Sequence, residues 1–154
     1  MLTETQAFLL NNAAYFILNH KPPGAGDALL KLATGQFDPN ARTPAILALQ
    51  DYWRDEMADQ VVPLLASKDK WIPIYAARLL AWAGDSRAAD TLVAAAKEKN
   101  ILAAASLAYL PANLSAAAAL KEALASDDQE FAKKLRQSLA QQTPARRAPG
   151  KSPS

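Results

Sequence analysis

The sequence predicts an all-α fold, an α-solenoid of about four helix pairs followed by a C-terminal capping helix. The first observation is a repeat, because Asp38, Asp69 and Asn100 stand 31 residues apart and each precedes an apolar helical run. The second is composition: hydrophobic residues make up 51% of the chain, much of it alanine, and there are only 5 glycines. Alanine is the best helix former. A repeat of this length indicates stacked helix pairs, each burying its apolar face against its neighbours.

The first unit covers about residues 3–36. Residues 7–18 are apolar, but they lack the preceding basic residues of a secretion signal, so they are interpreted as the first helix. The Lys-Pro-Pro-Gly stretch at 21–24 ends that helix. Asp27 is then expected to cap a short second helix that runs to Ala33.

The second unit opens at Asp38, where a capping side chain and the proline after it favour a helix start. Its two helices are predicted at about 41–53 and 56–66. Pro63 lies inside the second of them, and it should kink that helix because proline lacks a backbone donor.

The third and fourth units follow the same pattern. Asp69 is predicted to cap a helix over about 70–83, and Gly84 begins the turn to a second helix over 87–97. The fourth unit, from Asn100 to residue 126, is broken by a proline in the segment 110–113.

The C-terminal part of the chain is predicted to be one helix and a tail. A helix over 127–141 places Phe131 and Leu135 inward and its lysines and arginines outward, as the end of a solenoid requires. Residues 143–154 are rich in proline and cations, and we expect a disordered basic tail there. The predicted folded domain therefore covers residues 1–142.

The third unit resembles a short bacterial HEAT-like repeat, of the kind found in phycobilisome lyase-type proteins. Its matching positions are Ile72, Ala76, Ala77, Leu80, Gly84, Asp85, Ala88 and Ala89. The family's arginine matches Arg42 in the second unit, but Pro73 and Ala104 replace it in the next two, so the Asp–Arg ladder between units is expected to be missing. A tetratricopeptide pattern fits less well, because a step of 34 residues finds no second copy. The resemblance implies a right-handed solenoid with a convex and a concave binding surface.

The residues give little support to a catalytic or metal site. The chain has no cysteine and one histidine, His20, whose place at a helix C-terminus favours a structural role. It shows neither a phosphate-binding glycine loop nor a Ser–His–Asp set. An acidic cluster between the helices of the second unit is consistent with a cation or basic-peptide site, but acidic residues at a helix start explain it more simply. The cluster comprises Asp51, Asp55, Glu56 and Asp59. We expect no cofactor, no metal and no enzymatic activity.

Charge is distributed unevenly along the chain. Residues 1–130 carry 11 Lys and Arg against 15 Asp and Glu, whereas residues 131–154 carry six cations and no acid. An acidic body repels phosphate and argues against nucleic acid, although the basic end could add weak attraction. No apolar run reaches the roughly 18 residues that a membrane span needs. A cysteine-free chain of this composition fits the cytoplasm.

A stripe of aromatic residues is the strongest functional candidate. At 100° per residue, Trp71, Tyr75, Arg78 and Trp82 fall on one side of their helix, within about 60° of one another. Tryptophan, tyrosine and arginine dominate interface hot spots. The corresponding positions in other units are Tyr15, Leu47 and Tyr109. Two other interpretations stay open, burial of the stripe within the monomer and homodimerisation.

These observations predict a non-enzymatic protein–protein interaction module, a scaffold-like adaptor or accessory subunit that docks on a larger protein complex. The concave face implied by the resemblance would carry a mixed set of charges: Asp59, Asp90, Lys97 and Lys121. The resemblance also implies an alternative, an assembly factor or lyase-like chaperone for a cofactor-bearing protein. A DNA-binding HEAT-like protein fits less well, because the predicted body is acidic.

Overall fold

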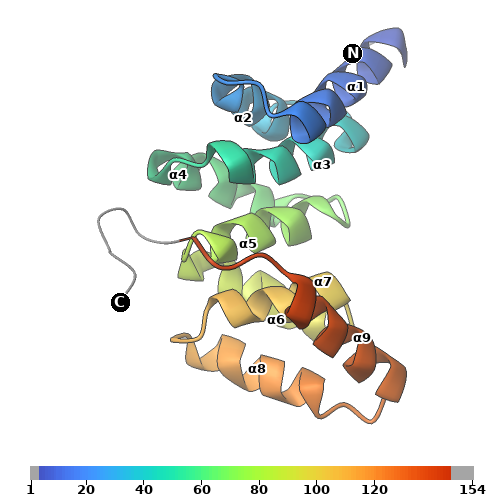
Figure 1. Ribbon diagram of the computed structural model, residues 1–154, viewed down its shortest axis with the longest axis vertical. Helices are drawn as coiled ribbons and strands as arrows, with labels where there is room; N and C mark the ends of the chain where they lie inside the picture. Colours follow the sequence, from blue (N-terminus) through green and yellow to red (C-terminus); the bar gives the residue numbers. More distant parts are fainter. Residues whose placement is uncertain (1–3, 147–154) are drawn as a thin grey trace. The chain divides into compact units, whose positions relative to one another are not determined.

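The computed structural model describes residues 4–146, apart from the side chains of Glu4 and Ala7, and it confirms the all-α prediction. In this part of the chain there are nine α-helices, five short 3₁₀ helices and no strand (Figure 1). None of the helices described here combines the length and the apolar character that crossing a membrane requires.

The chain divides into two compact units, one up to Leu79 and one from Leu80 onward. The helices of unit 1 are α1 Glu4–His20, α2 Gly26–Thr34, α3 Pro39–Ala48, η1 Leu49–Tyr52, η2 Asp55–Met57, α4 Ala58–Val61 and η3 Val62–Ala66. The next helix, α5 Ile72–Trp82, crosses the boundary between the units. The remaining helices, all in unit 2, are η4 Ser86–Ala88, α6 Ala89–Lys97, α7 Ile101–Ser106, η5 Leu107–Tyr109, α8 Leu114–Leu124 and α9 Gln129–Gln141.

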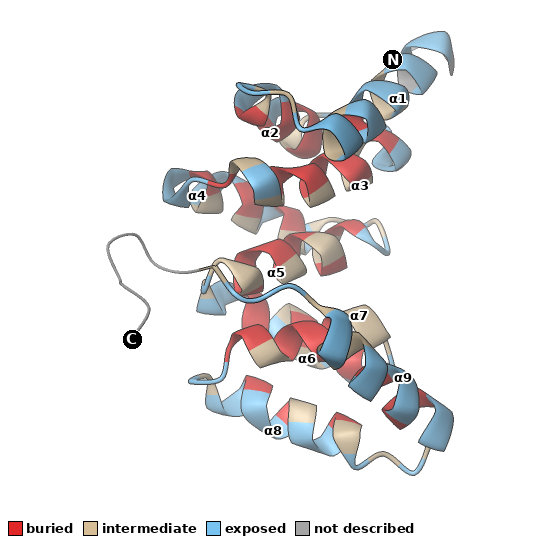
Figure 2. Ribbon diagram, viewed as in Figure 1, coloured by how far each residue is buried: buried red, intermediate tan, exposed pale blue. Residues whose placement is uncertain are grey.

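Unit 1 is built around α3, which lies against both α1 and α2. Its fully buried side chains include Leu29 from α2 and Ile46 from α3. Figure 2 shows the consequence for each helix: α3 is largely buried, whereas α1 is mostly exposed. The first helix is therefore covered on one side only.

Unit 2 contains two rows of helices. Helix α6 lies against α8, and α7 lies against α9, so helices two places apart in the chain are in contact (Figure 1). Alanines are buried where α7 and α8 meet their neighbours, and they include Ala103, Ala104 and Ala116. Their small side chains allow the helices to pack closely. The inward placement predicted for Phe131 and Leu135 of α9 is confirmed, since both are buried.

The residues that define the 31-residue spacing all occupy helix starts. The Asp38 carboxylate accepts from the backbone N–H of Asn40 at 2.8 Å. Asp69 accepts from the N–H of Ile72 at 3.0 Å at the start of α5. Asn100 does the same for α7, and Asn113 and Asp128 cap α8 and α9. Such side chains satisfy N–H groups that have no partner inside the helix.

The helices of the second sequence repeat, residues 38–66, are less regular than predicted. The helix expected over 41–53 ends as an α-helix at Ala48 and continues as the 3₁₀ helix η1. The helix expected over 56–66 consists of η2, α4 and η3, and Pro63 lies in the first turn of η3. Proline removes an α-helical hydrogen bond, so the shift to 3₁₀ geometry follows at that residue. The cap predicted at Asp27 is also wrong, because the N-cap of α2 is Ala25.

We expect Asp69→Ala to lower the free energy of unfolding by about 1 kcal/mol, because it leaves the N–H groups of Trp71 and Ile72 without their acceptor. Asp69→Asn should retain most of that stability, since asparagine also caps helices. Urea unfolding followed by circular dichroism measures both values. Equal losses in the two variants would contradict a capping role.

A second prediction concerns acid stability. The N–H of Phe131 donates to the Asp128 carboxylate, and this bond, with Lys99 nearby, holds the pKa of Asp128 below its ordinary 3.8. A lowered folded pKa stabilises the fold above the ordinary value, and the stabilisation is lost as pH falls through the folded pKa. The urea midpoint of Asp128→Asn should therefore fall less than that of the natural chain between about pH 5 and about pH 2.5. Urea midpoints that fall by the same amount in the variant and the natural chain would contradict this prediction.

Candidate interaction surfaces

One face of α1 carries a row of large apolar side chains that nothing in unit 1 covers. Phe8 is 64% exposed and Phe16 is 55% exposed, and Leu9 and Tyr15 are also exposed. Together they offer on the order of 400 Å² of apolar surface. The largest apolar patch on a monomer is often functional at this size.

This face exists because α1 is apolar on more than one side. Its inner side packs Ala14, which is fully buried, with Leu10 and Ile17 half-buried beside it. Phe16 points away from these residues and stacks on the His20 ring, with 4.3 Å between the ring centroids. His20 also donates from Nδ1 to the Phe16 carbonyl at 3.0 Å. His20 thus makes two contacts with Phe16 across the last turn of α1.

Part of the predicted aromatic stripe continues this face. Trp71 is 44% exposed, and its ring lies 6.4 Å from that of the half-buried Tyr75. Both rings line a hollow of about 200 Å³, together with Tyr15 of α1 and Thr43 of α3. We call this the aromatic hollow. Because Tyr15 and Phe8 are separated by two helical turns on the same side of α1, the hollow and the α1 face join at Tyr15.

The next residues of the stripe are less exposed. Arg78 is half-buried and donates from Nη1 to the Gln50 side-chain oxygen at 3.2 Å. Leu47 is also half-buried, one turn beyond Thr43 on α3. In unit 1 the structure therefore brings Tyr15, Trp71 and Tyr75 together at one hollow.

In unit 2 the chain's own C-terminal segment lies over two of the predicted residues. Trp82 donates from Nε1 to the Pro144 carbonyl at 3.1 Å, and the Arg146 N–H donates to the Trp82 carbonyl at 2.9 Å. Tyr109 is only 7% exposed, and its hydroxyl donates to the Thr143 carbonyl at 2.7 Å. Tyr109 therefore does not extend an exposed strip. We call residues 142–146 the strap.

The strap covers the first residues of the predicted tail. Disorder is predicted from Thr143 onward, and the described part of that segment makes hydrogen bonds with Trp82 and Tyr109. Composition hides these bonds, because Thr143, Pro144 and Arg146 make them through their backbone groups. The rest of the expected tail, residues 147–154, lies outside the described residues.

The four residues predicted for a concave face are all exposed. Lys97 lines a hollow beside α9, and Lys121 lines a separate groove along α8. Asp90 lies in the first turn of α6, and Asp59 belongs to unit 1. Within unit 2, Lys97 and Lys121 therefore line two different hollows.

The acidic cluster of unit 1 is engaged in ion pairs. Asp51 pairs with Lys21 at 3.3 Å, and Glu56 pairs with Arg54 at 3.1 Å. Across the described part of the chain, no group of three or more acidic or histidine side chains converges as a metal site would require.

Three residues of the α1 face were missed from the sequence: Phe8, Leu9 and Phe16. The available signal was that apolar residues surround the first helix instead of following one stripe, which is unusual for a helix with a solvent-facing side.

Comparison with family models, with curated proteins and with solved structures finds no match for this chain.

Removing both side-chain donors to the strap, with Trp82→Phe and Tyr109→Phe, should release it without unfolding unit 2. Losing two such bonds should accelerate hydrogen exchange at the Arg146 amide by about tenfold or more. NMR exchange rates measure this, with Trp71→Phe as the control that should leave the rate unchanged. An unaltered Arg146 rate in the double variant would show that the strap is held in some other way.

Proposed function

We propose that this protein is a non-enzymatic protein–protein interaction module, an adaptor or accessory subunit that docks on a larger protein assembly. The observation that carries the proposal is the clustering of exposed apolar side chains in unit 1. Among residues 4–146, six large hydrophobic side chains are exposed, and five of them belong to α1 and to the segment just before α5: Phe8, Leu9, Tyr15, Phe16 and Trp71.

The side chains of this surface and its lack of charge both favour a protein partner. Aromatic side chains supply large contact area and are enriched at interface hot spots. The α1 face lacks charged side chains from residue 5 to residue 19, so it offers no cation to phosphate or to an anionic membrane. Its polar neighbours Asn12 and Asn19 can supply hydrogen bonds at the rim of an interface.

The HEAT-like solenoid is part of the same proposal. Supporting it are the capping side chains at a 31-residue spacing and the contacts of α6 with α8 and of α7 with α9. Stacked helix pairs make contacts of this kind, because each unit packs on its neighbour. Helix α1 lies against α3 and presents an apolar outer side, which leaves that side available to a partner.

The test compares the natural chain with Phe8→Ser/Phe16→Ser. Both side chains are more than half exposed, so the variant should retain its helical circular dichroism. In pull-downs from cells that make the protein, it should lose a partner that the natural chain retains. Leu114→Ser is the matched control, because Leu114 is 87% exposed but lies on α8 in unit 2.

Sedimentation velocity on the same proteins separates the alternatives. A natural chain that sediments as a dimer, with a monomeric double variant, would make the α1 face a self-interface and overturn the adaptor proposal. A helical double variant that retains every partner would also overturn it.

A further inference from the structure

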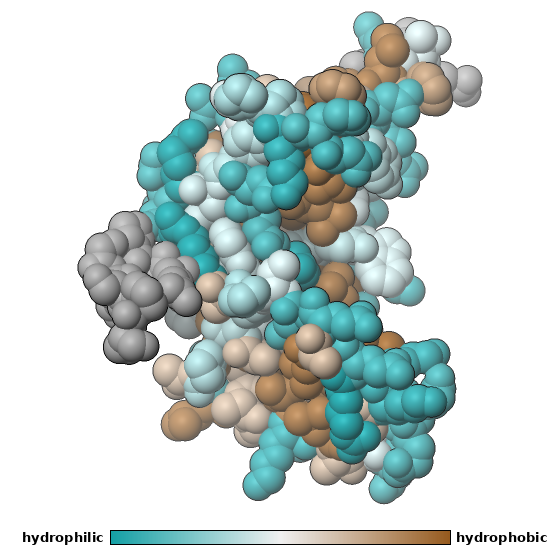
Figure 3. Space-filling view, viewed as in Figure 1, coloured by the Kyte–Doolittle hydropathy of each residue, from teal (hydrophilic) through white to brown (hydrophobic). Residues whose placement is uncertain are grey.

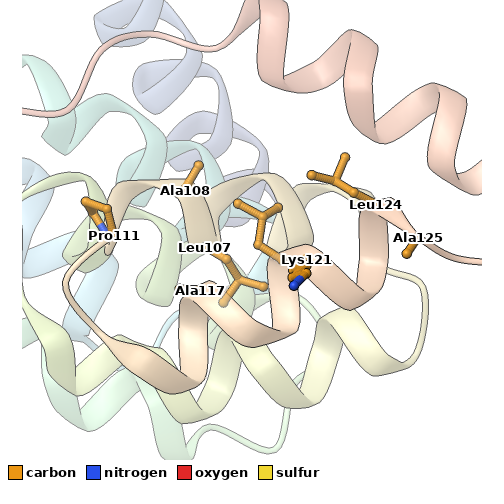
Figure 4. A pocket seen from close by; sticks show the side chains of 8 residues that line it. Leu107, Ala108, Pro111, Ala117, Lys121, Leu124 and Ala125 are labelled. Carbon is orange, nitrogen blue, oxygen red and sulfur yellow. The ribbon is translucent and has the colours of Figure 1, made fainter.

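A groove in unit 2 forms a second apolar surface, separate from the α1 face. It has a volume of about 500 Å³ and lies along α8 beside η5. Leu107 of η5 and Leu120 and Leu124 of α8 line it. Figure 4 looks onto this groove, which extends from Pro111 at one end to Ala125 at the other. In Figure 3 the same region is a brown apolar area between α8 and the hydrophilic helix α9.

The groove suits a short helix. Its α8 wall runs from Ala117 to Ala125, a length of about 12 Å or two helical turns. Two turns of a docked amphipathic helix place apolar side chains at i, i+3 or i+4, and i+7 on one face. Leu120 and Leu124 stand four residues apart on α8, so they lie one helical turn apart along this wall.

The charges beside the groove are positive. Lys121 lines the groove and is exposed, and no acidic side chain among residues 4–146 pairs with it. Arg136 of α9 reaches the end of the groove, where its Nη2 donates to the Leu124 carbonyl at 3.3 Å. Glu122, the acidic residue of α8, lines the different hollow that contains Lys97. The apolar floor is therefore bordered by cations.

Charge disfavours residues 147–154 as the occupant. Residues 147–154 contain Arg147 and Lys151 and no acid. Lys121 and Arg136 would repel them. The complementary ligand is apolar on one face and carries carboxylates beside it.

We propose that this groove binds an acidic amphipathic segment of a partner protein. Its apolar side chains lie between η5 and α8, and its carboxylates pair with Lys121 and Arg136. This site is independent of the α1 face. It deepens the proposed function, because it states the chemistry of a partner at a second surface.

The experiment selects peptides from a displayed library of random 16-residue sequences on the purified full chain. Selected peptides are then made with a fluorescein label, and their affinities are measured by fluorescence anisotropy. We expect a group of peptides with net negative charge and apolar residues at helical spacing. Lys121→Glu should weaken their binding about fivefold or more, and added salt should weaken it further.

Matched variants identify the site. Lys97→Glu makes the same charge change at the other hollow and should leave binding unchanged, whereas Leu124→Ser should reduce it about tenfold. Replacing a peptide carboxylate by lysine should restore binding to Lys121→Glu. Phe8→Ser/Phe16→Ser should bind these peptides normally, so failure of the unit 1 proposal remains distinguishable from failure here.

Three results would overturn the proposal. One is the absence of any enriched peptide. Another is enrichment of uncharged or basic peptides only. The third is a set of acidic peptides that bind Lys121→Glu and Leu124→Ser as tightly as the natural chain, because their site then lies elsewhere.

Discussion

The capping hydrogen bonds at the starts of five helices are the constraint on which much of the structure depends, and those helices are α3, α5, α7, α8 and α9. The α-helices after α1 have between four and thirteen residues, and helices of this length are marginal in isolation. A cap fixes the residue at which a helix begins, and this decides which side chains point inward. Three such caps stand at equal intervals in the sequence, at Asp38, Asp69 and Asn100. The buried positions of α3, α5 and α7 therefore recur at the same distances from their caps.

Helices α1 and α9 differ in the outer face that each presents to solvent. Helix α9 buries Phe131, Ala132 and Leu135 and presents lysines and arginine outward. Helix α1 buries Ala14 and presents Phe8, Leu9 and Phe16. A polar outer face is stable in water, whereas an apolar outer face is more stable when another surface covers it. The exposed large apolar side chains are therefore found on α1 and not on α9.

Much of the fold could be predicted from local signals, because caps, prolines and helical periodicity act within a few residues. The starts of α3, α5, α7 and α9 fall close to their predicted positions for this reason. The 3₁₀ segments were missed because the choice between i+3 and i+4 hydrogen bonds depends on packing. The site was predicted in part: periodicity grouped Trp71 with Tyr75, but it could not show that Thr143 and Pro144 accept from Tyr109 and Trp82. A contact between residues distant in the chain produces no periodic pattern in the sequence.

The three tryptophans occupy three different environments. Trp53 is buried in unit 1, Trp71 lies half in water at the aromatic hollow, and Trp82 is bonded to the strap through its indole N–H. Indole emission moves to longer wavelength as water reaches the ring, so each residue has its own optical signature. Single-tryptophan versions of the chain would report separately on the core of unit 1, the hollow and the strap. The tryptophans therefore serve as separate fluorescent probes of the unit 1 core, the aromatic hollow and the strap.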